Sequence, residues 1–244
     1  MTLLIKNVKY LVTCDDDNRV LKGVNVYVED GVIKSIGTDV QTADDVIDGS
    51  HMVMYPGLIN THHHLYQTFS RNLPEVQNME LFPWLKTLYE IWKNLNPDSV
   101  YYSSLTGMGE LLKTGCTCCL DHHYVFPTGT GMDLLDSQFA AVDALGMRFH
   151  ATRGSASILG RDDIGQIAEG MAADFFMINM DRLALTGAQF DVSSMLGTVG
   201  FKGNVDYTVV NGKVVVREGR LTGVDEDKIT EKANQCVTRY LGRS

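Results

Sequence analysis

Apolar and polar residues alternate along both ends of the chain, and this pattern predicts β-strands there. Residues 24–37 alternate on either side of Asp30-Gly31, and residues 207–216 do so on either side of Asn211-Gly212. An Asp-Gly or Asn-Gly pair between alternating runs is the strongest short-range signal for a β-hairpin. Together with the alternating residues 3–12, the pattern predicts β-rich chain ends with two tight hairpins.

The centre of the chain changes to a helical period. Apolar residues recur there at spacings of three and four, and short apolar runs lie between these stretches. We expect helices at residues 80–95, 97–113 and 133–145, strands at 116–120 and 147–153, and a terminal helix at 225–241. Strands that alternate with helices are typical of a parallel α/β arrangement. Residues 38–51 are polar and acidic and are expected to connect the two regions.

Three histidines follow a short apolar run. Residues 53–59 predict a buried strand, with His62, His63 and His64 at its C-terminal end. Alternate residues of a strand face the same way, so His62 and His64 are expected to point toward one position while His63 faces the other way. Imidazole is the commonest protein ligand of a metal such as Zn²⁺. The pair therefore predicts a metal site, and the alternative is a cluster of solvated histidines in a loop.

Residues 56–64, Pro-Gly-Leu-Ile-Asn-Thr-His-His-His, resemble the first-strand signature of the amidohydrolase superfamily. Residues 65–71, Leu-Tyr-Gln-Thr-Phe-Ser-Arg, resemble its 8-oxoguanine deaminase and chlorohydrolase-type branch. The resemblance implies a TIM-type (β/α)₈ barrel that carries one or two divalent metals, Zn²⁺ or alternatively Fe²⁺. It also implies a small β-sandwich built from both chain ends.

The chain is too short for a complete barrel of this kind. Such a barrel needs about 250 residues, whereas the α/β stretch from 58 to 155 has room for roughly three of its eight units. Residues 157–174 resemble the family segment that follows barrel strand eight. The resemblance thus implies three domains: residues 1–57 begin the sandwich, 58–155 form an incomplete barrel, and 156–244 complete the sandwich and end in a helix.

The resemblance implies an internal deletion of the later barrel strands, joined near residues 153–157, and with them the loss of recognisable catalytic residues. In the family a strand-five His, often a strand-six His and a strand-eight Asp complete the metal site, and a Glu shuttles protons. None of these can be assigned in this sequence.

Other candidate site residues are expected to hold the substrate. Gln67 resembles the amide that holds a purine-like ring in the family, although an ordinary loop Gln is the alternative. Trp84 offers an aromatic face for a planar heterocycle, but its helical spacing favours core packing. His122 and His123 end a predicted strand, at the face where barrels place their sites. One of them is expected to face the substrate, and the alternative is a supporting or surface pair. Asp121 either orients a histidine or forms a salt bridge.

Composition narrows the possible partners. The chain has 244 residues, 44% of them hydrophobic, and a formal net charge of -9. This charge argues against nucleic acid or an anionic membrane as a partner. We expect no signal peptide and no membrane span. Five cysteines without secreted spacing favour reduced thiols and the cytoplasm. An open three-strand sheet exposes an edge, which predicts a homo-oligomer.

Two functions of different classes follow from these patterns. The resemblance implies a metal-dependent hydrolytic deaminase of an aminated purine, pteridine or triazine, with an 8-oxoguanine-type ring as the best candidate. Hydrolysis of a chloro-triazine or of a ring amide is the second choice among related reactions. The alternative is a non-catalytic, internally deleted remnant that binds metal weakly or associates with other chains.

Overall fold

The computed structural model describes residues 1–152 and 163–242, which form two compact units. The first, here called the sandwich unit, comprises residues 1–59, 111–118 and 163–222. The second, here called the α/β unit, comprises residues 60–110, 119–152 and 223–242. The expected join near residues 153–157 lies outside the described residues.

Two β-sheets share one hydrophobic core in the described part of the sandwich unit. One sheet has the order β5-β4-β1-β6, and the other has the order β14-β13-β12-β11-β7-β2-β3. Buried Leu3 and Val26 from the first sheet and Met54 and Phe175 from the second belong to the same core. The strands of the first sheet are β1 (Thr2–Val8), β4 (Val24–Glu29), β5 (Val32–Gly37) and β6 (Asp45–Asp48). Those of the second are β2 (Tyr10–Val12), β3 (Val20–Leu21), β7 (Met52–Pro56), β11 (Phe175–Asn179), β12 (Tyr207–Val210), β13 (Lys213–Arg217) and β14 (Arg220–Leu221).

Both predicted hairpins are confirmed, and their turns touch. Asp30 and Gly31 have φ values of 51° and 80°, and Asn211 and Gly212 have 51° and 74°. Two successive positive φ values give the twist that a two-residue hairpin turn needs. A Cβ placed on Gly31 would lie 2.6 Å from Asn211 Oδ1, so only glycine fits there. The two ends of the chain are therefore packed together at these turns.

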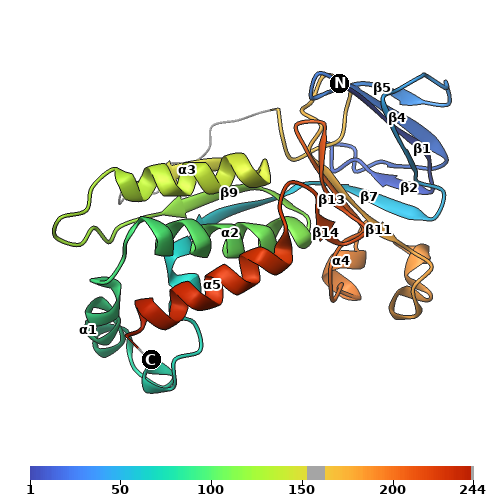
Figure 1. The fold of residues 1–244 in the computed structure, drawn as a ribbon. Coiled ribbons are helices and arrows are strands. Elements are labelled where there is room, and N and C mark those ends of the chain that lie inside the picture. Colours follow the sequence, from blue (N-terminus) through green and yellow to red (C-terminus); the bar gives the residue numbers. More distant parts are fainter. Residues whose placement is uncertain (153–162, 243–244) are drawn as a thin grey trace. The chain divides into compact units, whose positions relative to one another are not determined.

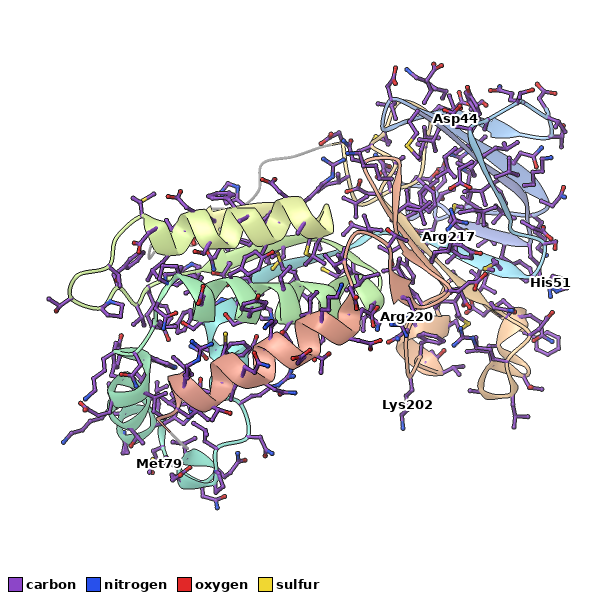
Figure 2. All side chains as sticks on the ribbon, viewed as in Figure 1. Asp44, His51, Met79, Lys202, Arg217 and Arg220 are labelled. Atoms are coloured by element: carbon purple, nitrogen blue, oxygen red, sulfur yellow. The ribbon has the colours of Figure 1, made fainter. Side chains whose placement is uncertain are left out.

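Paired charges fix the outer strands of the sandwich unit. Arg217 on β13, labelled in Figure 2, bonds the carboxylate of Asp45 on β6. His51, also labelled there, is exposed and bonds Asp181. The expectation that residues 38–51 only connect other elements is wrong, because Asp45–Asp48 pair in parallel with β1. That pairing depends on residues some 40 positions away, from Leu3 to Lys6, and leaves no local pattern.

The strand predicted at residues 53–59 is in fact two strands. β7 ends at Pro56 and β8 (Leu58–His63) begins after Gly57. The Gly57 N–H donates to the Asp174 carbonyl at 2.9 Å, and a Cβ on Gly57 would lie 2.0 Å from Thr117 Oγ1. Gly57 thus allows the chain to leave one sheet and enter another. The histidines stand within and just after β8, and Leu58 is 46% exposed rather than buried.

An open sheet of three strands, in the order β10-β9-β8, carries the histidines. β9 (Cys116–His122) and β10 (Arg148–Thr152) flank α3 (Asp133–Leu145) in the chain. Leu58 N–H donates to the Gly115 carbonyl at one end, and His64 Nδ1 lies 2.9 Å from the His122 carbonyl at the other. Like ends therefore meet, and β8 and β9 run parallel. The described residues form a mixed α/β structure in which no closed barrel is present.

Helices of the α/β unit enclose a second core. They are α1 (Leu81–Trp92), α2 (Pro97–Lys113) and α5 (Glu226–Tyr240), of which α2 matches its predicted bounds. Figure 1 shows α5 running along α2, and buried Val100, Trp92, Ala233 and Tyr240 share one cluster. Asp225 caps α5 by accepting hydrogen bonds from two backbone N–H groups. No helix in the described ranges is long and apolar enough to cross a membrane.

Candidate functional site

His62 and His64 point toward one position, as their spacing predicts. Their Nε2 atoms lie 3.2 Å apart and their rings are edge-to-face. With Zn–N bonds of about 2.0–2.1 Å, this separation corresponds to an angle of about 100° at a shared metal, close to tetrahedral. The two imidazoles therefore fit two ligand positions of one metal ion.

A backbone carbonyl fixes the tautomer of His64. The Nδ1 atom lies 2.9 Å from the His122 carbonyl oxygen, which can only accept a hydrogen bond. Nδ1 therefore carries the hydrogen, and the lone pair of Nε2 faces His62. Metal-binding histidines are usually held in this way by a hydrogen bond at the second ring nitrogen. The orientation of His64 is thus suited to a metal ligand before any metal arrives.

His63 faces away from the pair, also as the strand period predicts. Its Cε1 lies 3.8 Å from the place that a Cβ would take on Gly107 of α2, so the ring rests on that helix. Burial lowers the pKa of His63, and the nearby His64 lowers it further. A neutral ring against the helix gives this side chain a packing role.

A cavity of about 590 Å³ lies beside the histidines, within the α/β unit. Gln67, from the short helix η1 (Leu65–Ser70), and Trp84, from α1, both line it. Gln67 Nε2 donates to the Tyr124 hydroxyl at 2.9 Å. Trp84 is half-buried and meets Trp92 edge-to-face at 5.8 Å between ring centres. Trp84 therefore takes part in the core and in the cavity wall, and the two alternatives do not exclude each other.

Sequence reasoning missed one polar part of the cavity wall. Arg71 Nη1 donates to both carboxylate oxygens of Glu110, at 3.1 and 3.0 Å, and both residues line the cavity. They stand 39 positions apart on different elements, and no local pattern links them.

The two histidines at the end of β9 have different surroundings. The His122 ring is parallel to that of His62, with centres 5.6 Å apart, and its Nε2 is buried without a hydrogen-bond partner. His123 is fully buried, and its Nε2–H donates to the Val125 carbonyl at 3.0 Å. Burial lowers the pKa of His123 to about 4, so the ring is neutral. His122 thus faces the histidine pair, and His123 packs behind it against Tyr66.

Asp121 holds the loop that follows His64. One carboxylate oxygen accepts from the Leu65 N–H at 2.6 Å, and the other accepts from Gln138 Nε2 at 2.8 Å. Burial raises the pKa of this carboxyl group to about 6, partly offset by the two hydrogen bonds. The carboxylate thus accepts from a backbone amide and a side-chain amide, neither a histidine nor a cation. It therefore positions η1 and Gln67 relative to β9.

The metal ligand set is incomplete in the described part of the chain. No group of three or more His, Cys, Asp or Glu side chains in residues 1–152 and 163–242 is arranged to hold a metal ion. The donor chemistry of His62 and His64 fits Zn²⁺, which usually has three or four protein ligands. Two imidazoles are thus placed as two metal ligands would be, and the described residues bring no third donor to them.

Comparison with known proteins gives one consistent family. Two family models, each described as "Amidohydrolase family", match residues 53–157 and 149–216. The chain is 44% identical over 158 residues to 8-oxoguanine deaminase of Pseudomonas aeruginosa, covering 60% of this chain and 35% of that protein. It is 35% identical over 197 residues to hydroxydechloroatrazine ethylaminohydrolase of Pseudomonas sp. strain ADP, covering 75% and 41%.

Solved structures agree with the sequence comparison at the level of the fold. Atrazine chlorohydrolase from Arthrobacter aurescens TC1, complexed with zinc, superposes with a TM-score of 0.88 at 16% identity, covering 96% of this chain and 100% of that one. By sequence, the chain spans only about a third to two fifths of the length of the curated relatives named above (35% and 41%). The matches cover the histidine strand, the α/β centre and the C-terminal strands, and the chain belongs to the amidohydrolase family.

Proposed function

We propose that this chain is a shortened hydrolytic deaminase that binds a metal and a purine-like heterocycle, and that it does not turn the heterocycle over by itself. The observation that carries the proposal is the pair of Nε2 atoms 3.2 Å apart beside a cavity lined by Gln67 and Trp84. The 44% identity to an 8-oxoguanine deaminase supports an aminated oxopurine as the ring.

Each side chain has a defined part in this proposal. Trp84 offers its face to the planar ring. The Gln67 amide, held by Tyr124, offers a polar group to the ring edge. His62 and His64 hold the metal, Zn²⁺ or alternatively Fe²⁺, and a bound metal would supply a Lewis acid that acidifies water. The cavity, at about 590 Å³, is within the usual range of roughly 300–1,000 Å³ for small-molecule sites.

We expect no turnover because of the side chains that surround His62 and His64. Hydrolytic deamination needs a group that moves protons between water and the leaving nitrogen. The carboxylates nearest the site are already engaged, since Asp121 accepts from two amides and Glu110 pairs with Arg71. The described residues also bring no third metal-ligating side chain to the histidine pair. We therefore expect binding without ammonia release.

We also propose a domain arrangement for the shortened chain. Residues 1–57 and 156–244 would keep the two halves of the family sandwich, and residues 58–155 would keep three barrel units. Supporting this, the sequence alignments cover only 35% and 41% of the curated relatives. Free cysteines at all five positions support a cytoplasmic location. Uncovered sheet edges support self-association, which sedimentation of the pure chain tests.

The test measures binding and turnover separately. Quenching of tryptophan fluorescence by 8-oxoguanine, with and without Zn²⁺, reports binding, and ammonia release reports turnover. We expect metal-dependent quenching, no ammonia, and weaker binding in Gln67→Leu but not in the control Gln189→Leu. Absence of quenching contradicts the ring site, and ammonia release contradicts the lack of turnover.

A triazine ring is a second candidate because of the longer alignment with hydroxydechloroatrazine ethylaminohydrolase, which covers 75% of this chain. The same titration with an alkylamino-hydroxytriazine and with a chloro-triazine decides between the rings. Tighter binding of either triazine than of the oxopurine would transfer the proposal to triazines, with amine or chloride as the leaving group of the ancestral reaction.

A further inference from the structure

The ring of His122 lies beside the rings of His62 and His64. The ring centres of His62, His64 and His122 are 4.9, 5.6 and 6.0 Å apart in pairs. With metal–nitrogen bonds of about 2.0–2.1 Å, rings that share one tetrahedral metal have centres about 5 Å apart. The three imidazoles are therefore already clustered at nearly the spacing that a shared metal requires.

The Nε2 atom of His122 also lacks a partner. It is buried and makes no hydrogen bond within the described chain. A buried polar atom without a partner carries an uncompensated desolvation cost. A bond to a metal would remove that cost, so the ring gains by turning toward the pair.

Other candidates for the third ligand are already committed. His63 rests on α2, and His123 is fully buried with its Nε2–H on the Val125 carbonyl. Asp121 accepts from two amides, and Glu110 pairs with Arg71. His63 Nδ1 and His123 Nδ1 are unpaired too, but His63 packs on α2 and His123 against Tyr66, whereas the His122 ring lies beside both His62 and His64.

We propose that His62, His64 and His122 form a three-histidine metal site in this chain. In the conformation described, no three donors converge on one point, so the His122 ring must turn about its side-chain bonds when the metal binds. The hydrogen bond from His64 Nδ1 to the His122 carbonyl already ties the two strand ends together. Three protein ligands leave one position of a tetrahedral metal open to water or to a polar atom of a ligand.

This inference rests on the proposed metal binding by His62 and His64, and the experiment separates the two. The pure chain is titrated with Co²⁺, whose strong visible absorption marks four-coordinate sites, and bound metal per chain is measured after dialysis. Gel filtration of the loaded protein shows whether metal links two chains. The variants are His62→Ala, His122→Ala and His122→Gln, with exposed His150→Ala as the matched control. Circular dichroism confirms that each variant is folded.

We expect one Co²⁺ per monomer and a strong visible band. His122→Ala and His122→Gln should weaken binding about 10–100-fold and weaken the band, whereas His150→Ala should change neither. If His62→Ala abolishes binding while both His122 variants bind as the natural chain does, the three-histidine site is wrong and the proposed metal pair stands. Half a metal per chain in a dimer overturns the site in favour of a metal bridge. Absence of binding in the natural chain overturns both.

Discussion

The sandwich unit and the α/β unit differ in how completely their polar groups are paired. Six buried side-chain atoms in the described chain have no hydrogen-bond partner, and all six lie in the α/β unit. They belong to His63, Ser104, His122, His123, Gln138 and Tyr240. Buried polar groups in native proteins are nearly always paired. The buried side-chain polar atoms of the sandwich unit are thus hydrogen-bonded, whereas six in the α/β unit are not.

This difference indicates where the proposed loss of barrel strands has its effect. The sandwich unit is closed by contacts between the two chain ends, such as the abutting hairpin turns at Gly31 and Asn211. The three-strand sheet keeps open edges, and two of the six unpaired atoms, those of His63 and His122, belong to its strands. A shortened chain would therefore retain a stable sandwich and a site with unpaired polar atoms. Four predictions test this comparison.

The largest expected effect is loss of the sandwich core. Phe175 is fully buried in the cluster that both sheets share. Phe175→Ala should lower the free energy of unfolding by about 3–5 kcal/mol, because the lost contacts leave a cavity. Phe190→Ala, at an 89% exposed position of the same unit, should change it by no more than about 0.5 kcal/mol. Urea denaturation followed by circular dichroism measures both, and equal effects would show that this core is not closed.

A smaller effect is expected where the chain changes sheets. A Cβ on Gly57 would lie 2.0 Å from Thr117 Oγ1, and the Gly57 backbone is fixed by its bond to Asp174. Gly57→Ala should cost about 1–3 kcal/mol through overpacking. Gly37→Ala, where nothing lies within 4 Å of the added Cβ, should be neutral or slightly stabilising. The same denaturation assay applies, and a neutral Gly57→Ala would mean that β7 and β8 can separate at little cost.

Gly57 also shows how far local pattern predicts this fold. The turns at Asp30-Gly31 and Asn211-Gly212 and the bounds of α2 and α3 follow from neighbouring residues, and the structure confirms them. The break at Gly57 and the strand β6 depend on partners far along the chain, namely Thr117 and β1. Local periodicity carries no information about such partners.

Some features of the candidate site likewise follow from local sequence, and others depend on distant residues. The period of a strand is enough to predict that His62 and His64 share a face and that His63 does not. The tautomer of His64 depends on the carbonyl of His122, which is 58 positions away. Which of His122 and His123 faces the pair depends on the register of β9. The contact between Arg71 and Glu110 is equally invisible in the sequence.

The hydroxyl groups of two buried tyrosines, one in each unit, differ in their hydrogen bonding. The Tyr55 hydroxyl of the sandwich unit donates to the Val192 carbonyl at 2.6 Å, whereas the Tyr240 hydroxyl of the α/β unit has no partner. Tyr55→Phe should cost about 1 kcal/mol by removing a hydrogen bond, and Tyr240→Phe should be neutral or stabilising by a similar amount. Thermal and urea denaturation of both variants measure the difference. Equal losses would show that Tyr240 is paired in solution and would remove one of the six unpaired atoms.

The smallest effect concerns a surface turn of the sandwich unit in which the Asp15 carboxylate is paired. Asp15 accepts from Arg19 Nε and from the Thr13 hydroxyl, each at 2.8 Å. These hydrogen bonds, that of Arg19 first, lower the pKa of Asp15 to about 2. The pKa is about 3.9 in an unfolded chain, so the charged form stabilises the folded state above pH 4. This contribution is lost as the pH falls from about 4 toward 2.

Stability measured against pH should therefore show a difference between the natural chain and Asp15→Asn that narrows below pH 4. The carboxyl resonance of Asp15 should titrate near pH 2 in the natural chain and closer to 4 in Arg19→Gln, which lacks the guanidinium that donates to Asp15. A midpoint near 4 in both proteins would mean that the turn is open in solution. In that event the turn at Asp15 would add unpaired polar groups to the sandwich unit. Only the buried side-chain atoms would then distinguish the hydrogen bonding of the two units.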